Sequence, residues 1–249
     1  MKKGIFTLTA SEELLPGFRR LTLEGDTAAI TRPGQFVEVG IPGFFLRRPF
    51  SVADVDGSAL RIAVRAAGAG TEALISLEPG ARLDVLTGLG NGFDLSDSGE
   101  RPLLIGGGSG IPALYTACCA LAASGARVTA ALGFNRDSEA FYTGEFAALG
   151  TDVEVYTADG SLGRSGFVTA ALADFEYTSV YACGPVPMLR RVDELTRAPA
   201  QLSLEARMGC GFGACMGCTV ETVAGPKRVC KDGPVFRSGE LVWSSVAGA

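Results

Sequence analysis

The sequence of 249 residues contains no histidine. Histidine is the side chain most often used as a general base and as a metal ligand, so histidine-based catalysis and histidine-ligated metal sites are excluded. Long apolar runs are missing too: no stretch of about 18 uncharged apolar residues occurs, as a membrane-spanning helix would need. Any enzymatic chemistry is therefore expected to come from a bound cofactor.

Basic residues are also in the minority, with 22 Lys and Arg against 27 Asp and Glu and a net charge of −5. This balance argues against a nucleic-acid-binding protein, which is usually basic. Residues 1–6 lack the extended apolar segment of a secretory signal peptide. Seven cysteines without an evident disulfide framework favour a reducing compartment, so we expect a cytoplasmic protein without membrane segments.

What the chain does have is a cluster of cysteines near its C-terminus. The spacing C-x4-C-x2-C-x11-C is formed by Cys210, Cys215, Cys218 and Cys230. This is the ligand spacing of a plant-type [2Fe–2S] cluster, in which each of two irons takes two thiolates. Glycines alternate with these ligands, and they allow successive backbone N–H groups to converge on an anion. The spacing predicts an electron carrier.

Two alternatives compete with this interpretation. Disulfides are disfavoured because these cysteines are too close in sequence to join distant segments and because seven is an odd number. Zinc sites usually come as two C-x2-C or C-x2-H pairs, whereas only Cys215 and Cys218 form such a pair here. Cys118 and Cys119 lie in an apolar run and are expected to be buried small residues.

Residues 1–97 are expected to form a domain of short antiparallel strands. Apolar residues alternate at 18–23, 35–39 and 60–64, and Pro-Gly or Asp-Gly turns separate these segments. Such a pattern predicts an antiparallel β-barrel or sandwich. The acidic stretch 94–100 is a candidate linker to the next domain.

From residue 98 to residue 198 the pattern becomes that of a parallel α/β domain. Strands are expected at 103–105, 126–134, 153–156 and 179–183, and helices at 111–123 and 138–149. Alternation of strands and helices indicates a parallel sheet covered by helices. After Pro199 the chain leaves this pattern, so residues 199–249 are expected to form a separate cysteine module.

Two motifs in the α/β domain suggest a nucleotide cleft. Residues 106–112, Gly-Gly-Gly-Ser-Gly-Ile-Pro, follow a strand and precede a helix, where a pyrophosphate can meet free N–H groups. Residues 183–189, Cys-Gly-Pro-Val-Pro-Met-Leu, follow the last predicted strand, at the sheet edge where ligands bind. Each motif alone could be an ordinary tight turn; together they predict two walls of one cleft.

Two further motifs lie in the predicted barrel. In Arg47-Arg48-Pro49-Phe50-Ser51, Pro49 keeps Arg48 out of helix, and Arg48 could grip a phosphate while Ser51 meets a flavin edge. In residues 65–74, small residues lead into a helix with Thr71 as candidate N-cap. A solvated pair of arginines and an ordinary capped helix are the alternatives.

The order of these motifs resembles that of the ferredoxin–NADP reductase superfamily. The motifs are RxxS at 48–51, GxGT at 68–71, GGGxGxP at 106–112 and CGPxPML at 183–189. With the cysteine module, the chain is similar to the iron–sulfur flavoprotein family of dihydroorotate dehydrogenase B electron transfer subunits. Leu162 departs from the family pattern, because relatives often place an aromatic residue after Asp-Gly-Ser.

The resemblance implies three cofactor sites. FAD is expected at Arg48, Pro49, Phe50, Ser51, Ala63, Val64, Arg65, Gly70 and Thr71. NAD is expected at Gly106, Gly107, Gly108, Gly110, Cys183, Gly184 and Pro185, with Cys183 either near the flavin–nicotinamide contact or simply packed. The [2Fe–2S] cluster is expected on the four cysteines named above. Arg136 could meet the 2′-phosphate of NADP, although a surface arginine is the simpler interpretation.

The resemblance also implies a function and a partner. An FMN-containing dihydroorotate dehydrogenase catalytic subunit would oxidise dihydroorotate, in a heterotetramer with two copies of each chain. Electrons would pass through the cluster and FAD to NAD⁺ in pyrimidine (UMP) biosynthesis, and this chain alone would be inactive on dihydroorotate. The alternatives are a subunit of an NADPH–ferredoxin or sulfide dehydrogenase complex and a non-catalytic zinc or regulatory module.

Overall fold

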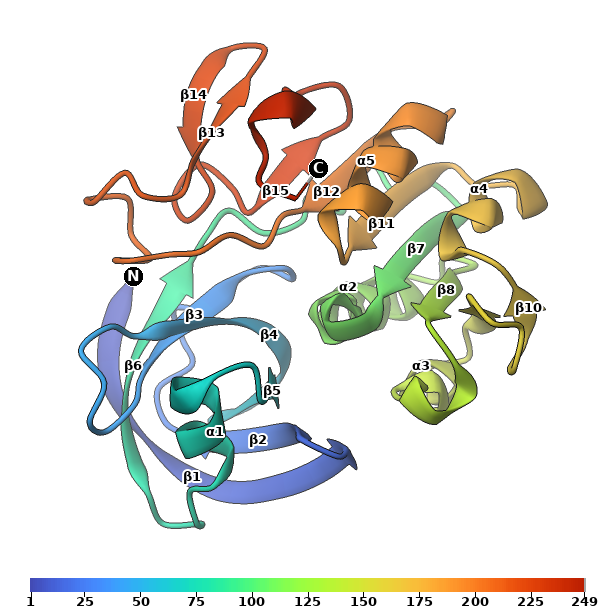
Figure 1. The fold of residues 1–249 in the computed structure, drawn as a ribbon. Helices are drawn as coiled ribbons and strands as arrows, with labels where there is room; N and C mark the ends of the chain where they lie inside the picture. Colours follow the sequence, from blue (N-terminus) through green and yellow to red (C-terminus); the bar gives the residue numbers. More distant parts are fainter. Residues whose placement is uncertain (249) are drawn as a thin grey trace.

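Six antiparallel strands close into a barrel at the N-terminal end of the computed structural model, which describes residues 1–248 (Figure 1). The barrel order is β1-β2-β5-β4-β3-β6. The strands are β1 (Lys2–Leu15), β2 (Phe18–Glu24), β3 (Phe36–Gly40), β4 (Arg48–Asp56), β5 (Ala59–Arg65) and β6 (Arg82–Leu89). A short helix, α1 (Ala69–Ile75), links β5 to β6. The predicted β-barrel is confirmed.

Alternation along the strands explains how the core of the barrel is filled. In β5, Leu60, Ile62 and Val64 are fully buried in the barrel core, while the residues between them face outward. Period-two burial of this kind places every second side chain inside. The predicted N-cap at Thr71 is wrong: α1 begins after Gly68, and the Thr71 hydroxyl instead accepts a hydrogen bond from the Ala67 N–H at 2.8 Å.

The second part is a seven-stranded sheet of order β10-β9-β8-β7-β11-β12-β15. Its strands are β7 (Pro102–Gly107), β8 (Thr129–Phe134), β9 (Asp152–Thr157), β10 (Arg164–Ser165), β11 (Ser179–Cys183), β12 (Ala200–Ser203) and β15 (Val235–Arg237). Its helices are η1 (Gly108–Gly110), α2 (Ile111–Ala123), η2 (Asp137–Glu139), α3 (Thr143–Ala148), η3 (Val168–Ala170), α4 (Ala171–Asp174) and α5 (Val186–Leu195). All neighbouring strands are parallel except β12 and β15.

Two expectations for this part need correction. The helix expected at 138–149 is only α3, because the chain first makes the short η2 turn and Tyr142 then adopts a positive φ of 65°. Residues after Pro199 do not leave the sheet at once: β12 pairs parallel to β11, and β15 pairs antiparallel to β12. The cysteine region is therefore built onto the sheet edge. The domain divisions at 97/98 and 198/199 remain predictions.

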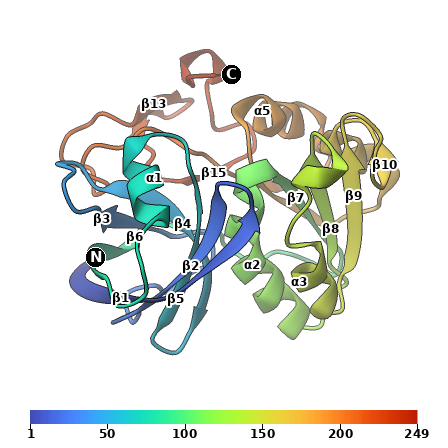
Figure 2. The ribbon, with the colours of Figure 1, turned by 60° about the horizontal axis from the view of Figure 1, so that its bottom comes forward.

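The cysteine region lies above the junction of barrel and sheet (Figure 1). It contains the hairpin β13 (Thr219–Thr222) and β14 (Gly225–Arg228), and η4 (Trp243–Ser245) follows near the C-terminus. Helix α2 lies between barrel and sheet (Figure 2), and its buried face shares one apolar core with Phe18 of the barrel. Among the described residues, no helix has the length and apolar character needed to cross a bilayer.

Candidate cofactor cleft and iron–sulfur site

A cleft of about 240 Å³ opens where the barrel, the sheet and the cysteine region meet. Its walls carry aromatic and small side chains with a few polar groups, which suits a flat ring system. Most of the lining comes from Phe18, Phe36, Pro49, Phe50, Ser51, Ala63, Arg65, Ser109, Pro112, Ser203, Leu204, Glu205, Ala206, Met208 and Pro234. The cleft therefore unites residues from all three parts of the chain.

Many of the predicted flavin residues lie at this cleft or beside it. Pro49, Phe50 and Ser51 from β4 line the cleft, as do Ala63 and Arg65 from β5. Val64 is different, since its side chain is fully buried in the barrel core and only its backbone could serve a ligand.

Arg48 and the start of α1 also meet, which brings the two barrel motifs together. A Cβ on Gly70 would lie 3.3 Å from both Nε and Nη2 of Arg48. The Arg48 Nη1 group donates to the carbonyl of Leu46 at 2.6 Å. Glycine at position 70 thus leaves room for the Arg48 guanidinium, which the Leu46 carbonyl holds in place. A planar guanidinium group with several N–H donors suits a phosphate group.

The two α/β motifs pack directly against each other. A Cβ on Gly110 would lie 2.6 Å from the backbone of Cys183, and a Cβ on Gly107 would lie 2.7 Å from the sulfur of Met188. A Cβ on Gly106 would lie 2.8 Å from Ile111. Packing thus explains three of the four predicted glycines, while Gly108, with φ +48° and nothing within 4 Å of its Cβ position, faces open space.

Cys183 is buried at the end of β11 and belongs to the apolar core around α2. Burial raises the pKa of its thiol, so it is neutral at physiological pH. Gly184 beside it is buried and Pro185 is exposed. The packing interpretation of Cys183 thus has direct support in its surroundings.

The four candidate cluster ligands lie as two pairs. The Cys215 N–H points to the Cys210 sulfur at 3.5 Å, and the Cys230 N–H points to the Cys218 sulfur at 3.4 Å. Within residues 1–248, no three His, Cys, Asp or Glu side chains converge on one ion position. A [2Fe–2S] cluster requires two thiols for each of its two irons. The two cysteine pairs therefore fit a [2Fe–2S] cluster.

Backbone N–H groups add to the fit. Burial alone would raise the pKa of Cys210, but the N–H groups of Cys215, Phe212 and Ala214, together with the Cys215 side chain, outweigh it and lower the pKa to about 6. In the second pair, burial and the neighbouring Cys218 raise the pKa of Cys230 to about 12. The first pair, Cys210 and Cys215, therefore receives N–H donors that favour the thiolate form. The second pair, Cys218 and Cys230, is shielded from water.

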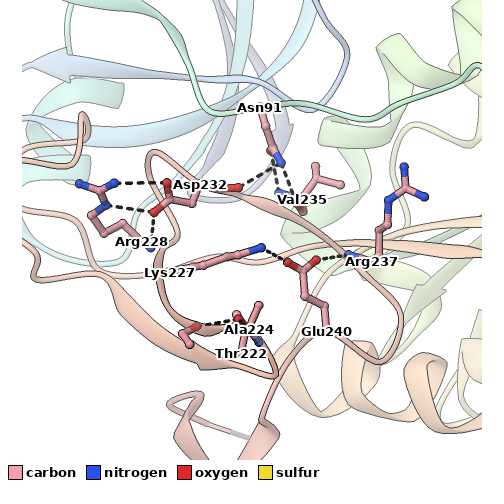
Figure 3. Close-up of polar contacts among 10 residues, drawn as sticks. Asn91, Thr222, Ala224, Lys227, Arg228, Asp232, Val235, Arg237 and Glu240 are labelled. Carbon is pink, nitrogen blue, oxygen red and sulfur yellow. Dashed lines mark hydrogen bonds and ion pairs between the residues drawn. The ribbon is translucent and has the colours of Figure 1, made fainter.

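The segment after Cys230 is anchored to the barrel through Asn91. The Asn91 side-chain amide donates to the Val235 carbonyl at 2.8 Å, and its oxygen accepts from the Val235 N–H at 3.1 Å (Figure 3). Arg228 and Asp232, which flank Cys230 in the sequence, bond to each other. Sequence inspection did not point to this contact, because an isolated Asn in a Gly-rich turn gives no signal of its partner.

Glu38 is the functional candidate that sequence reasoning missed. It lies on β3, is 0% exposed, and neither carboxyl oxygen has a hydrogen-bond partner among the described residues. Burial raises its pKa to about 7. Its position in the alternating segment 35–39 gave the only available signal, a charged residue between valines in a strand expected to be buried.

Other candidates lie away from the cleft. Cys118 is buried in α2, as expected, while Cys119 is half-buried. Arg136 pairs with Glu139 on the surface. Leu162 is exposed, and its backbone is held by the Thr157 hydroxyl.

A closed barrel beside a parallel sheet, with a cleft between them and paired cysteines above it, defines an iron–sulfur flavoprotein reductase of the ferredoxin–NADP reductase type. The family model for the iron–sulfur cluster binding domain of dihydroorotate dehydrogenase B matches residues 205–242. The chain belongs to the family of dihydroorotate dehydrogenase B electron transfer subunits. The predicted family and fold class are thereby confirmed.

Individual relatives support this membership. The dihydroorotate dehydrogenase B (NAD(+)) electron transfer subunit of Shouchella clausii is 40% identical, over 97% of this chain and 98% of the relative. That of Geobacillus thermodenitrificans is 44% identical, over 89% of this chain and 91% of the relative. Among solved structures, the chain is similar to that of the NADH-dependent reduced ferredoxin-NADP oxidoreductase, a structure that gives insights into flavin-based electron bifurcation. It has a TM-score of 0.88 and 28% identity, covering 97% of this chain and 91% of that one.

Proposed function

We propose that this chain is the electron-transfer half of a two-subunit dihydroorotate dehydrogenase. The catalytic partner, carrying FMN, oxidises dihydroorotate to orotate in pyrimidine biosynthesis, and two copies of each subunit form a heterotetramer. When bound to this chain, a [2Fe–2S] cluster would carry single electrons, and FAD would supply two of them together with a proton as a hydride to NAD⁺. Free cysteines throughout the chain suit a reducing cytoplasm.

This proposal rests on one observation: the segment that lines the cleft continues directly into the loop that carries Cys210. Residues 203–206 and Met208 line the cleft, and Cys210 follows two residues after Met208. Two redox groups held in these places would be separated by one short stretch of backbone. A carrier of single electrons and a hydride donor side by side make up an electron relay.

The residues of the chain bind and orient in this relay, and none of them needs to abstract a proton from dihydroorotate. Arg48 and Gly70 hold the flavin pyrophosphate, and Ser51 and Arg65 contact the ring system. Gly108 offers an open backbone to the pyrophosphate of NAD. The absence of histidine is compatible with this division, because proton abstraction from the substrate belongs to the partner.

An exposed apolar surface around the first cysteine pair is the proposed docking face for the catalytic subunit. Phe212 and Met216 flank Cys215 and are 43% and 53% exposed. The loop between β3 and β4 carries a further exposed apolar side chain, the fully exposed Phe45. Apolar side chains grouped on a surface mark interaction sites, and an exposed ligand brings the cluster close to the partner.

Co-purification of the two subunits tests this proposal. We expect yellow-brown protein with flavin, iron and sulfide, and a stable complex with the catalytic subunit. Phe212→Asp and Met216→Asp should weaken that complex at least tenfold, about 1.4 kcal/mol. Val223→Asp is the matched control, because Val223 is 74% exposed in the β13–β14 hairpin. Equal weakening by all three variants would contradict the docking face.

A further inference from the structure

Arg65 brings an unpaired positive charge to the flavin cleft. It is the last residue of β5, its side chain is exposed, and it lines the cleft together with Phe50 and Ser51. Within residues 1–248 its guanidinium forms no ion pair and lies instead over the ring of Phe18, with Cζ 4.6 Å from the ring centroid. A cation without a counter-ion in a binding cleft is free to meet negative charge on a ligand.

Phe18 holds this guanidinium from the adjacent strand. It begins β2 and is the register partner of Arg65 in the pairing of β2 with β5. Its side chain is buried, and it packs in the apolar core around α2 rather than in the barrel core. The face of an aromatic ring attracts a guanidinium, so a fixed Phe18 ring limits the positions that the Arg65 side chain adopts.

The α/β domain holds the Phe18 ring in turn. Phe141, which lies just before α3, meets Phe18 edge to face, with the ring centroids 4.9 Å apart and the ring planes at 86°. Phe141 also contacts Phe134, the last residue of β8, at a centroid distance of 5.6 Å. Edge-to-face contacts stabilise aromatic pairs beyond the area that they bury. A row of aromatic rings therefore leads from the parallel sheet to the arginine in the cleft.

We propose that Phe18 is a positioning residue of the flavin site, which holds the Arg65 guanidinium in place for a bound FAD, and that Phe141 supports it from the α/β domain. The inference rests on the proposed function, because it assigns FAD to this cleft. A long side chain that is already ordered loses less conformational freedom when it binds a ligand. Phe141 thus contributes to flavin binding although it does not line the cleft.

The test compares FAD dissociation constants of the full chain, measured from the flavin fluorescence released on dilution. Phe18→Leu keeps an apolar side chain but removes the ring, so it should weaken FAD binding about fivefold, the cost of ordering one long side chain. Phe18→Tyr keeps the ring and should bind FAD as tightly as the wild-type chain. Phe141→Leu should weaken FAD binding in the same direction, and it replaces Phe18→Leu if that variant does not fold.

A double-mutant cycle with Arg65→Met separates this role from packing. If Phe18 acts through Arg65, Phe18→Leu should weaken FAD binding no further once Arg65→Met has removed the guanidinium. An equal loss in both backgrounds would show that Phe18 only packs. Unchanged FAD binding by Arg65→Met would likewise overturn the proposal.

Phe93→Leu is the matched control. Phe93 is a buried phenylalanine of the same apolar core as Phe18 and meets Tyr181 edge to face at 5.6 Å, but it does not line the cleft. Its loss should therefore leave FAD binding unchanged, and weakening equal to that of Phe18→Leu would contradict a specific role of Phe18. Failure of the proposed function would instead appear as a wild-type chain that binds no FAD.

Discussion

At the scale of single residues, the two cysteine pairs differ in environment. Cys218 and Cys230 are buried, whereas Cys215 is exposed and Cys210 is half-buried. The buried pair is fixed by the surrounding core, while the outer pair is shaped by a loop in which Gly211, Gly213 and Met216 have positive φ. Left-handed backbone at these positions turns successive N–H groups toward sulfur.

Gly211→Ala tests how tightly this loop is specified. The added Cβ would meet Glu38 at 2.4 Å on a backbone with φ +75°, so we expect a loss of about 1–3 kcal/mol in stability and a lower iron content. Gly225→Ala is the matched control, with φ +99° and nothing within 4 Å. Thermal unfolding and iron analysis of both variants check this, and equal losses would show that backbone strain alone matters.

At the scale of elements, the segment that carries Cys230 depends on the turn after β6. Asn91 makes its paired hydrogen bonds to Val235, and a Cβ on Gly90 would lie 2.5 Å from Pro234. This turn therefore couples the barrel to the strand β15 at the sheet edge. Cluster retention should depend on a residue that is not itself a ligand.

Asn91→Ala would leave the Val235 backbone groups without their partners, at a cost of about 1–3 kcal/mol. We expect a lower midpoint in urea unfolding and faster loss of iron to a chelator. Asn135→Ala, which removes a surface hydrogen bond to Glu139, should change neither. Unaltered iron release from the Asn91 variant would contradict this coupling.

The stability of the protein at acid pH tests a second link between elements, the pairing of Asp84 with Lys3 and Arg47. Burial would raise the pKa of Asp84, but hydrogen bonds from Lys3 and Arg47 outweigh it and hold the pKa below its usual range. Because the unfolded chain then binds the proton more readily, this stabilisation is present above the ordinary carboxyl pKa and is lost as the pH falls. Asp84→Asn should therefore cost up to about 1 kcal/mol near neutral pH and nothing at pH 2. A constant difference across that range, measured by chemical denaturation, would argue against the ion pair.

A local period or an apolar run was enough to predict α2 and the strands β2, β3, β5, β7, β8, β9 and β11, whereas α5 and the strands β1, β4 and β6 were not predicted one by one. The alternation at 60–64 and the apolar run at 103–105 are visible without tertiary information. Strand β12 was missed, since four residues, Ala200–Ser203, carry no period of their own and are held by pairing with β11. Glu38 was missed for a related reason: the loop that buries it is more than 170 residues away in sequence.

For the candidate site, the sequence motifs predicted which residues matter, but they did not predict whether each residue serves ligand binding or packing. The cysteine spacing predicted the ligand set, and the structure groups it in pairs. Three of the glycines at 106–110 owe their identity to close packing against Ile111, Cys183 and Met188. Such contacts join two loops that are distant along the chain, so a linear motif cannot distinguish them from ligand contacts.

At the scale of the whole molecule, three parts meet at one cleft. The barrel contributes one wall, the sheet contributes the loop at 109–112, and the cysteine region contributes residues 203–208. The cysteine loop faces outward beside the exposed apolar surface of Phe212 and Met216. Under the proposed function, this arrangement would give the electron path a direction, from a partner on the outside through the cysteines to the cleft.

Reduction of NAD⁺ by dihydroorotate, followed as NADH absorbance, tests this path most directly. The account predicts no turnover by this chain alone and turnover once the catalytic subunit is added. Cys215→Ser, which removes the exposed member of the proposed ligand set, should abolish turnover by the complex together with its iron–sulfur absorbance, whereas Cys119→Ser should leave both intact. Turnover by the isolated chain, or full activity of a Cys215→Ser complex without a cluster, would contradict the account.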